Sequence, residues 1–463
     1  MTRPHSLMEV TGALSERARN VRFTFGDDTV LVAVQHMLAQ TVDLFRALGE
    51  IGLRPENIFA LGKIYSNNAP VIAAIRDLGV TIVESTVPQP GNFDESFEQD
   101  IKRLWEVVAQ SLNHRRIKRI IVLDEGGHCV TNTPSELLEK YLFAGVEQTS
   151  RGIFMFEEKP PPFAVFAWAR AAVKLQIGGH LFSHCLIERL RNKFLRGKPL
   201  RGLEIGILGL GSIGRGLADL ASREGSRVFF YDPRPCPQIL RYLQDRITRV
   251  ESLEKLMQRC DYVLGASGRN PFDGKWPLAH RPGLKLISAS GGDHEFGPVI
   301  RDLRNGTSFR VEDESWDVAS DDGPSGPISI AYLGFPYNFV SRAEAAVPTR
   351  IVQLETGGLL AGLIEARSYL TLVEDGHERN AGIHRISPEA QRFTFETWLR
   401  AMEDHRIDVR EIYGYEAALF TATKRNNWFA VHSEPGASKG NGSISRLEQV
   451  MTRMVNRQFR AGL

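Results

Sequence analysis

Cysteine is scarce in this chain of 463 residues, which contains four, and no two of them form a CxxC pair. They lie far apart, at Cys129, Cys185, Cys236 and Cys260. The spacing therefore offers neither a disulfide framework nor a zinc motif. We expect reduced thiols in a cytoplasmic protein, and we expect no metal site.

An excess of charge of one sign and long apolar runs are also missing. Lys and Arg number 57 against 55 Asp and Glu, a net charge of +2 that gives no electrostatic reason to expect nucleic acid. No run of about 18 apolar residues occurs, so we expect no contact with a membrane. The first ten residues, MTRPHSLMEV, lack the apolar core of a secretory signal. The content of 42% hydrophobic residues is ordinary for globular proteins and excludes wholesale disorder.

The first half of the chain alternates short β-rich runs with helical patterns. Strands are expected at 29–34, 58–61, 80–84 and 120–123, and helices at 35–52, 69–78 and 94–112. A long helix is expected from 163 to 195, and a second series of strands and helices begins at Leu203. Strands separated by helices favour parallel sheets that are covered on both faces. Ligands bind such sheets beyond the carboxyl ends of the strands, where Glu125 follows the fourth run.

A glycine-rich turn is the sharpest motif and lies between an expected strand, 203–208, and an expected helix, 212–224. Its first glycine permits a tight turn, its second lets the backbone approach a pyrophosphate, and its third lets helix and strand pack closely. The first residues of the helix offer free N–H groups to the phosphates. The residues of the turn are Gly209, Leu210, Gly211, Ser212, Ile213 and Gly214.

An acidic residue occupies the position that binds the ribose in dinucleotide-binding units. Asp232 ends the strand after the turn, where a carboxylate accepts hydrogen bonds from ribose hydroxyls and repels a 2′-phosphate. This predicts NAD rather than NADP, with Arg234 weakening the preference without reversing it. The next strand ends in small residues, Gly265 to Gly268, and Ser267 among them is a candidate for contact with the cofactor. An ordinary loop is the alternative for that segment.

Four segments in the same order along the chain resemble the S-adenosylhomocysteine hydrolase family, over roughly residues 25–395. The segment 36–41, HMLAQT, resembles the family's HMTxQT helix start, and LDEGG at 123–127 resembles its LDDGGD loop. GVEQTS at 145–150 resembles the stretch that ends in EETTTG. The turn at 209–216 resembles GYGDVGKG, although it is equally close to the turn of 2-hydroxyacid dehydrogenases.

The resemblance implies a split substrate domain, an NAD domain, and a nucleoside whose hydroxyl is oxidised by bound NAD. It assigns acid–base roles to Glu125, Lys174 and His36. It assigns substrate contacts to Gln40, Thr41 and Gln148, and His180 lies in the hinge-like segment as a further candidate. It assigns NAD contacts to Thr149 and Ser150.

Several positions depart from the family's pattern. Gln148 stands where the family has a ribose-binding glutamate, and Gly178 with Gly179 replaces an Asp-Asn pair. His294 is displaced from the position of the family's loop histidine. Because several groups that orient the ribose are altered together, we expect no efficient hydrolysis of S-adenosylhomocysteine.

The expected fold is α/β, with two Rossmann-like, doubly wound parallel-sheet domains, a cleft between them and a helical C-terminal extension. A split substrate-type domain is expected at 1–180 and 346–395, an NAD-binding domain at 181–345, and the extension at 396–463 with a linker at 436–443. An amphipathic stretch follows this small-polar linker, so we expect it to assemble the chain into a homo-oligomer.

The expected function is that of an adenosylhomocysteinase-like enzyme that uses bound NAD on a nucleoside-like or hydroxylated small molecule, as an oxidoreductase or lyase. A non-catalytic, NAD-bound regulatory or scaffold protein is the alternative from another class. A third possibility is an NAD-dependent 2-hydroxyacid dehydrogenase. That enzyme would need an arginine and a Glu–His pair around a carboxylate substrate, and His294 with Glu295 is a nearby hint.

Overall fold

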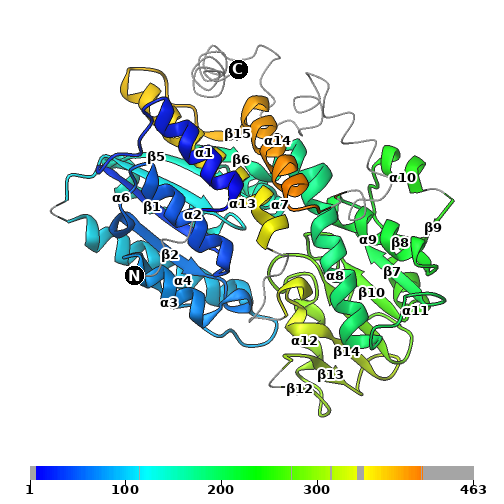
Figure 1. Cartoon of the computed structure of the whole chain (residues 1–463). Coiled ribbons are helices and arrows are strands. Elements are labelled where there is room, and N and C mark those ends of the chain that lie inside the picture. Colours follow the sequence, from blue (N-terminus) through cyan, green and yellow to red (C-terminus); the bar gives the residue numbers. More distant parts are fainter. Residues whose placement is uncertain are drawn as a thin grey trace. The chain divides into compact units, whose positions relative to one another are not determined.

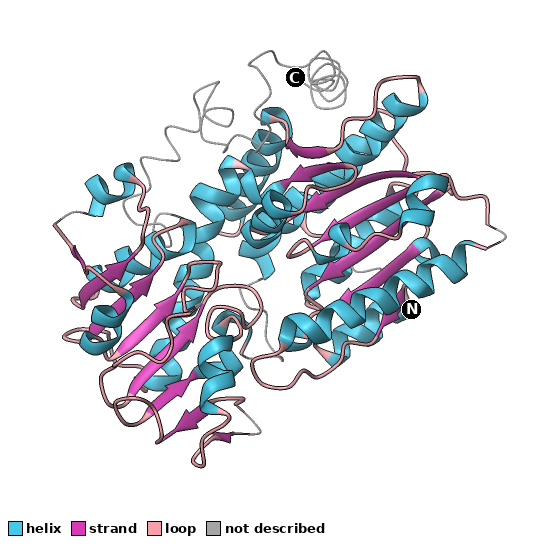
Figure 2. Cartoon of the chain, turned by 180° about the vertical axis from the view of Figure 1, so that it is seen from behind, coloured by secondary structure: helices cyan, strands magenta, loops and turns pink. Residues whose placement is uncertain are grey.

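The computed structural model describes residues 7–409 except 114, 244, 273, 313–314, 341–348 and 408. The chain divides into two compact units (Figure 1). Unit 1 contains the described residues up to Ser85, those from Glu98 to Gly178, and those after Pro348. Unit 2 contains Thr86–Phe97 and the described residues within Gly179–Val347. Each unit is a mostly parallel sheet covered by helices, which confirms the expected α/β class (Figure 2).

Unit 1 is built on a seven-stranded parallel sheet in the order β15-β6-β5-β4-β1-β2-β3. Strands β1 and β4 are buried along their whole length, as expected for a parallel sheet covered on both faces. The order reverses between them, and ligands bind at such a reversal in open α/β sheets. The strands are β1 Thr29–Gln35, β2 Ile58–Gly62, β3 Thr81–Val83, β4 Arg119–Asp124, β5 Leu142–Glu147, β6 Ala164–Ala167 and β15 Gly382–Arg385.

A long buried helix, α13 (Thr349–Glu374), packs against β5, α1, α2 and α14. Gly358 lets it approach Trp168 closely, because a Cβ there would collide with the indole ring. The other helices are α1 Glu9–Asn20, α2 Ala39–Glu50, α3 Ala69–Asp77, α4 Phe93–Leu112, α5 His128–Thr131, α6 Ser135–Lys140, α7 Ser150–Glu158 and α14 Pro388–Asp404. Among the described residues, no helix combines the length and apolar character needed to cross a membrane.

Unit 2 contains an eight-stranded sheet in the order β12-β13-β14-β11-β10-β7-β8-β9, in which β13 pairs antiparallel with both β12 and β14. Its order reverses between β7 and β10, which are neighbours. The strands are β7 Glu204–Leu208, β8 Arg227–Tyr231, β9 Ile247–Arg249, β10 Tyr262–Gly265, β11 Leu284–Ser288, β12 Arg310–Val311, β13 Val318–Ser320 and β14 Ile328–Ile330. The helices are α8 Gly179–Phe194, α9 Ser212–Arg223, α10 Pro237–Leu243, α11 Leu253–Arg259 and α12 Gly297–Leu303.

The prediction of a long helix over 163–195 is wrong. The segment forms β6, a 3₁₀ turn at Trp168–Arg170, a π-helical turn at Lys174–Gly178 and only then α8. Strand β6 pairs with β5 on one side and β15 on the other, so distant partners override the helical pattern. Thr86–Phe97 belongs to unit 2, although the sequence placed it in the first domain. The C-terminal stretch from 410, with the linker at 436–443, lies outside the described residues.

Candidate functional site

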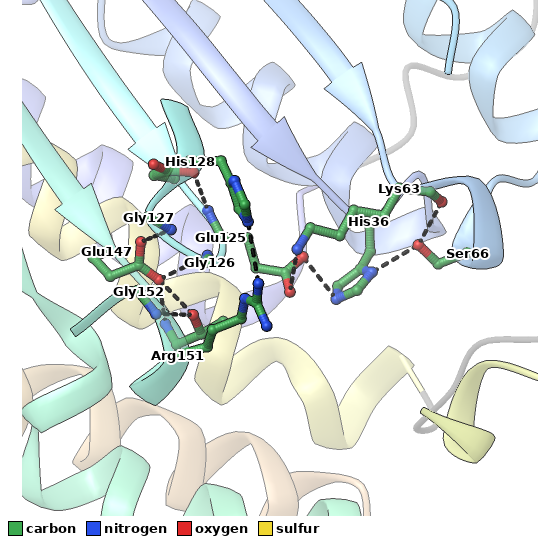
Figure 3. Close-up of polar contacts among 12 residues, drawn as sticks. His36, Lys63, Ser66, Glu125, Gly126, Gly127, His128, Glu147, Arg151 and Gly152 are labelled. Atoms are coloured by element: carbon green, nitrogen blue, oxygen red, sulfur yellow. Dashed lines mark hydrogen bonds and ion pairs between the residues drawn. The ribbon is translucent and has the colours of Figure 1, made fainter. Parts of the chain in front are cut away.

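The carboxyl edge of the sheet in unit 1 gathers polar side chains from four neighbouring strands (Figure 3). His36 follows β1, Lys63 follows β2, Glu125 follows β4 and Gln148 follows β5. The strands are parallel, so these residues share one edge. His36 and Glu125 flank the point where the strand order reverses, which is the expected ligand position in such sheets.

Glu125 is the centre of this cluster and bonds to two basic side chains. His36 Nε2 lies 3.0 Å from its Oε2, and Lys63 Nζ lies 3.3 Å from its Oε1. The side chains of Glu125 and Lys63 are each 3% exposed. Burial alone raises the pKa of Glu125, but the charges and hydrogen bonds of His36 and Lys63 outweigh it and lower that pKa to about 2. Glu125 is therefore a buried, ionised carboxylate at neutral pH.

The imidazole of His36 is held at both ring nitrogens. Its Nδ1 lies 2.7 Å from Ser66 Oγ, and that hydroxyl lies 3.1 Å from the carbonyl oxygen of Lys63. The ring of Tyr65 packs beside it, with 5.8 Å between the ring centroids. Thr41 Oγ1 donates to the carbonyl oxygen of His36 over 2.6 Å. The ring therefore has a fixed orientation toward Glu125 (Figure 3).

A diglycine loop presents Glu125 to its partners. Gly126 and Gly127 have φ of +105° and +81°, a left-handed conformation that favours glycine. Their N–H groups donate to the buried Glu147 carboxylate over 3.1 and 3.0 Å. Burial and the neighbouring Asp124 raise the pKa of Glu147 well above its usual range. Asp124, whose pKa burial raises to about 6, accepts from the N–H of Glu125 over 2.8 Å.

The predicted NAD contacts Thr149 and Ser150 lie at the start of α7 in unit 1. Thr149 caps the helix, because its Oγ1 accepts from the N–H of Gly152 over 3.2 Å. The same hydroxyl lies 2.6 Å from Glu147 Oε1, so Thr149 also supports the diglycine loop. Ser150 is exposed. Arg151 follows, with its Nη2 3.3 Å from His128 Nε2 on the same edge of the sheet.

Lys174 forms an ion pair of its own, beyond the end of β6. Its Nζ lies 2.7 Å from Glu355 Oε2 on α13, and Trp168 Nε1 donates to the same oxygen over 2.8 Å. A Cβ on Gly178 would collide with the other oxygen of Glu355. Glycine at 178 therefore makes room for a carboxylate from a distant helix.

Of the three acid–base candidates, the structure joins His36 and Glu125 directly and pairs Lys174 with Glu355. The substrate candidates Gln40 and Thr41 lie in the first turn of α2, immediately after His36. Gln148 is nearly buried, and its N–H donates to the carbonyl of Asp124 over 3.2 Å. Lys63, Glu147 and Glu355 were not singled out in the sequence. Position could have indicated two of them, because Glu147 ends a buried strand and Lys63 follows another.

The glycine turn of unit 2 has the form that a pyrophosphate requires. Gly209 has φ of +87°, and a Cβ there would lie 2.6 Å from Ser267 Cα. A Cβ on Gly214 would collide with the carbonyl oxygen of Gly209. A Cβ on Gly211 would meet nothing within 4 Å, so the backbone of Gly211 is open to a ligand. Ser212 and Ile213 begin α9, whose first N–H groups face this space.

Asp232 lies beside the turn, as predicted for a ribose-binding acid. Its Oδ2 accepts from the N–H of Leu210 over 2.7 Å, and its Oδ1 accepts from the N–H of Arg234 over 2.8 Å. A carboxylate has about four acceptor positions, so each oxygen keeps capacity for a ribose hydroxyl. His180 in α8 is buried, and burial with the charges of Arg215 and Arg223 lowers its pKa to about 3.

The space beside Gly265, at the end of β10, is taken by a side chain. A Cβ on Gly265 would collide with the Glu295 carboxylate. Asp293 and Glu295 are buried, with exposed fractions of 3% and 0%. Both the N–H and the hydroxyl of Ser267 donate to Glu295 Oε1, over 2.7 and 2.6 Å.

Comparison with known proteins identifies the domain around this turn. Residues 183–270 match the family described as D-isomer specific 2-hydroxyacid dehydrogenase, NAD binding domain. The match contains β7, the glycine turn, α9, β8 with Asp232, and β10. The chain therefore contains an NAD-binding domain, and its cofactor is NAD.

Two proteins of Mycobacterium tuberculosis are similar over a longer stretch. They bear the names Uncharacterized protein MT0113, from strain CDC 1551, and Uncharacterized protein Rv0104, from strain H37Rv. Each is 28% identical to the chain over 333 residues, which is 71% of this chain and 62% of theirs. The chain thus spans less than two thirds of the length of these relatives.

Proposed function

We propose that the protein is an NAD-dependent oxidoreductase that acts on a hydroxylated, nucleoside-like small molecule. His36, Lys63 and Glu125 are the polar groups on the substrate side. One observation carries the proposal: a buried, ionised carboxylate bonds to two basic side chains at the ligand-binding edge of unit 1. The same chain has an NAD-binding domain in unit 2.

Different residues of unit 2 suit different chemical groups of the cofactor. The backbone at Gly211 and the first turn of α9 would hold the pyrophosphate, and Asp232 would hold the adenosine ribose. When bound, NAD would supply a hydride acceptor, which suits oxidation of a carbinol carbon and the reverse reaction.

Removal of a hydroxyl proton requires a base, and His36 in its neutral form is the candidate, with its Nδ1 reached through the Ser66 hydroxyl. Glu125 is a weak base because its pKa is about 2, so it orients His36 and Lys63 rather than taking the proton. The Ser66 hydroxyl has one proton, which it donates either to the Lys63 carbonyl or to His36 Nδ1. Ser66 would pass its proton to His36 Nδ1 and take the substrate's hydroxyl proton in exchange, which charges the imidazole without moving its ring. The ammonium of Lys63 stabilises negative charge that develops on a bound hydroxyl.

The proposal keeps the nucleoside-like substrate of the S-adenosylhomocysteine hydrolases but not their hydrolysis. Gln148 cannot act as a carboxylate, and no side chain is present at Gly178 or Gly179. The Lys174–Glu355 pair offers a second polar contact for a hydroxylated substrate.

Oxidation of a 2-hydroxyacid is the second candidate, and three observations favour it. The matched NAD-binding domain is of the 2-hydroxyacid dehydrogenase type. The structure also contains a Glu–His pair, formed by Glu125 and His36 rather than by Glu295 and His294. Lys63 and Arg151 lie on the same edge and suit a carboxylate.

Reduction of bound NAD tests the proposal. The NAD-loaded protein is mixed with adenosine or with D-lactate, and absorbance is followed at about 340 nm, where NADH absorbs and NAD does not. We expect a rise with adenosine. Glu125→Gln should slow it by about 10²–10⁴-fold, because His36 loses the group that orients it. Glu136→Gln, at an exposed glutamate of α6, is the matched control and should leave the rate unchanged.

The outcomes separate the candidates. A rise with D-lactate alone would move the assignment to a 2-hydroxyacid dehydrogenase. No rise with either compound would contradict an oxidoreductase and favour the regulatory or scaffold alternative. With S-adenosylhomocysteine, a thiol reagent should detect no rapid release of homocysteine.

A further inference from the structure

Glu295 in unit 2 is a fully buried carboxylate with no assigned role. Its exposed fraction is 0%, and no described residue forms an ion pair with it. Its Oε1 accepts from the N–H and the hydroxyl of Ser267, over 2.7 and 2.6 Å. Its Oε2 accepts from the hydroxyl of Ser288 over 3.2 Å. Burial raises the pKa of Glu295 above its usual value, although the hydrogen bonds from Ser267, Ser290 and Ser288 oppose this shift.

Ser267 lies in a short loop that packs directly against the glycine turn. A Cβ on Gly209 would lie 2.6 Å from Ser267 Cα and 2.8 Å from Ser267 N. The loop is also bonded to β7, because the N–H of Ala266 donates to the carbonyl of Leu208 over 2.8 Å. The Gly268 N–H donates to Ser290 Oγ over 3.0 Å. The loop is thus held between the glycine turn and the carboxylate of Glu295.

This loop follows β10, on the far side of the strand-order reversal from the Asp232 half of the sheet. Figure 1 labels β7 and β10, which pair in parallel. In sheets of this order a dinucleotide lies across the reversal, with one mononucleotide on each half. Asp232 marks the β7–β9 half as the adenosine side. The loop after β10 therefore belongs to the half that receives the nicotinamide mononucleotide.

We propose that Glu295 is a positioning residue of the NAD site, which fixes the loop after β10 through Ser267 and so sets the affinity for the nicotinamide half. Gly265 is required for this arrangement, because any side chain there would displace the carboxylate. The inference rests on the NAD-binding domain and not on the proposed reaction, so a failure of one leaves the other standing.

The test compares two ligands on cofactor-free protein by isothermal titration. NAD spans both halves of the site, whereas ADP occupies the adenosine half alone. In Glu295→Ala the N–H and hydroxyl of Ser267 lose their acceptor, so NAD affinity should fall by about tenfold or more. ADP affinity should stay within about twofold, because ADP makes no contact with that half.

Two conservative variants separate positioning from a general structural effect. In Glu295→Gln the amide oxygen still accepts from Ser267, so NAD affinity should stay within about threefold of the unmutated protein. Glu295→Asp keeps the charge but is one methylene shorter, so it should reproduce the loss seen with alanine.

The matched control is Asp219→Asn. It alters another buried acid of unit 2, which bonds to Arg246 and Arg223 and does not contact the loop. It should not weaken NAD binding selectively. An equal loss of NAD and ADP in Glu295→Ala, unchanged NAD affinity there, or a loss in Glu295→Gln as large as in alanine would each overturn the proposal.

Discussion

Replacing Glu125 with glutamine is expected to lower the free energy of unfolding of unit 1 by about 3–5 kcal/mol. The substitution removes the carboxylate that lies 3.3 Å from the Lys63 ammonium, which is 3% exposed. A buried charge that loses its partner keeps its full desolvation cost, which is why the effect exceeds that of a surface ion pair. Hydrogen exchange of the buried amides in β1 and β4 measures the effect in unit 1 alone.

A double variant supplies the control for this first result. Lys63→Met combined with Glu125→Gln removes both charges, and most of the lost stability should return. A decrease of less than about 1 kcal/mol in the single variant would contradict the ion pair, since that is the scale of exposed pairs.

The effect of the Glu125 substitution should depend on pH with a defined sign. The pKa of Glu125 is lowered from an unfolded value of about 4.3 to about 2 in the folded chain. A lowered carboxyl pKa contributes stability above the unfolded pKa and loses it as pH falls toward the folded one. The difference between the two proteins should therefore be full above about pH 5 and should shrink as pH falls from about 4 to 2.

Replacing Gly209 with alanine is expected to weaken NAD binding by about 100-fold or more. A Cβ there would lie 2.6 Å from Ser267 Cα and 2.8 Å from Ser267 N, both backbone atoms that cannot rotate away. The turn and the loop must separate, which withdraws N–H groups from the pyrophosphate. Loss of two charge-assisted hydrogen bonds, each about 1.5–3 kcal/mol, accounts for this factor. Isothermal titration of cofactor-free protein gives the affinity.

Gly202→Ala is the matched control for the strain of a left-handed residue. Gly202 has φ of +84°, nearly the +87° of Gly209, but its Cβ would meet nothing within 4 Å. Both variants therefore carry a similar backbone cost of about 1–2 kcal/mol. Only Gly209→Ala should lose NAD. Equal affinities in the two variants would show that the turn does not approach the cofactor.

The sequence predicted correctly those elements whose formation depends on residues close together in the chain. The run Ile120–Leu123 forms the buried strand β4, and the turn at Gly209–Gly214 joins a strand to a helix as its glycines indicated. The segment Phe163–Leu195 failed, because the four residues of β6 become a strand only through β5 and β15. The residues of the segment do not themselves indicate which strands they will pair with.

The polar partners of the site were the least predictable part. Lys63 and Glu355 acquire their roles through partners distant in the sequence, Glu125 and Lys174. A lone lysine or glutamate in a sequence is most often a solvated surface residue, so neither one was notable by itself. Gly265 shows the same limit. Its small size makes room for the Glu295 carboxylate, a partner 30 positions away that the sequence did not indicate.

Titration of cofactor-free protein with NAD and with NADP tests the central claim most directly. The carboxylate of Asp232, fixed by the N–H groups of Leu210 and Arg234, accepts from the ribose hydroxyls and repels a 2′-phosphate. We expect NAD to bind about tenfold tighter or more, and Asp232→Ala to remove most of that difference. Equal affinities in the unmutated protein would contradict the role of Asp232 at the ribose. No binding of either dinucleotide would contradict NAD-dependent chemistry at this turn.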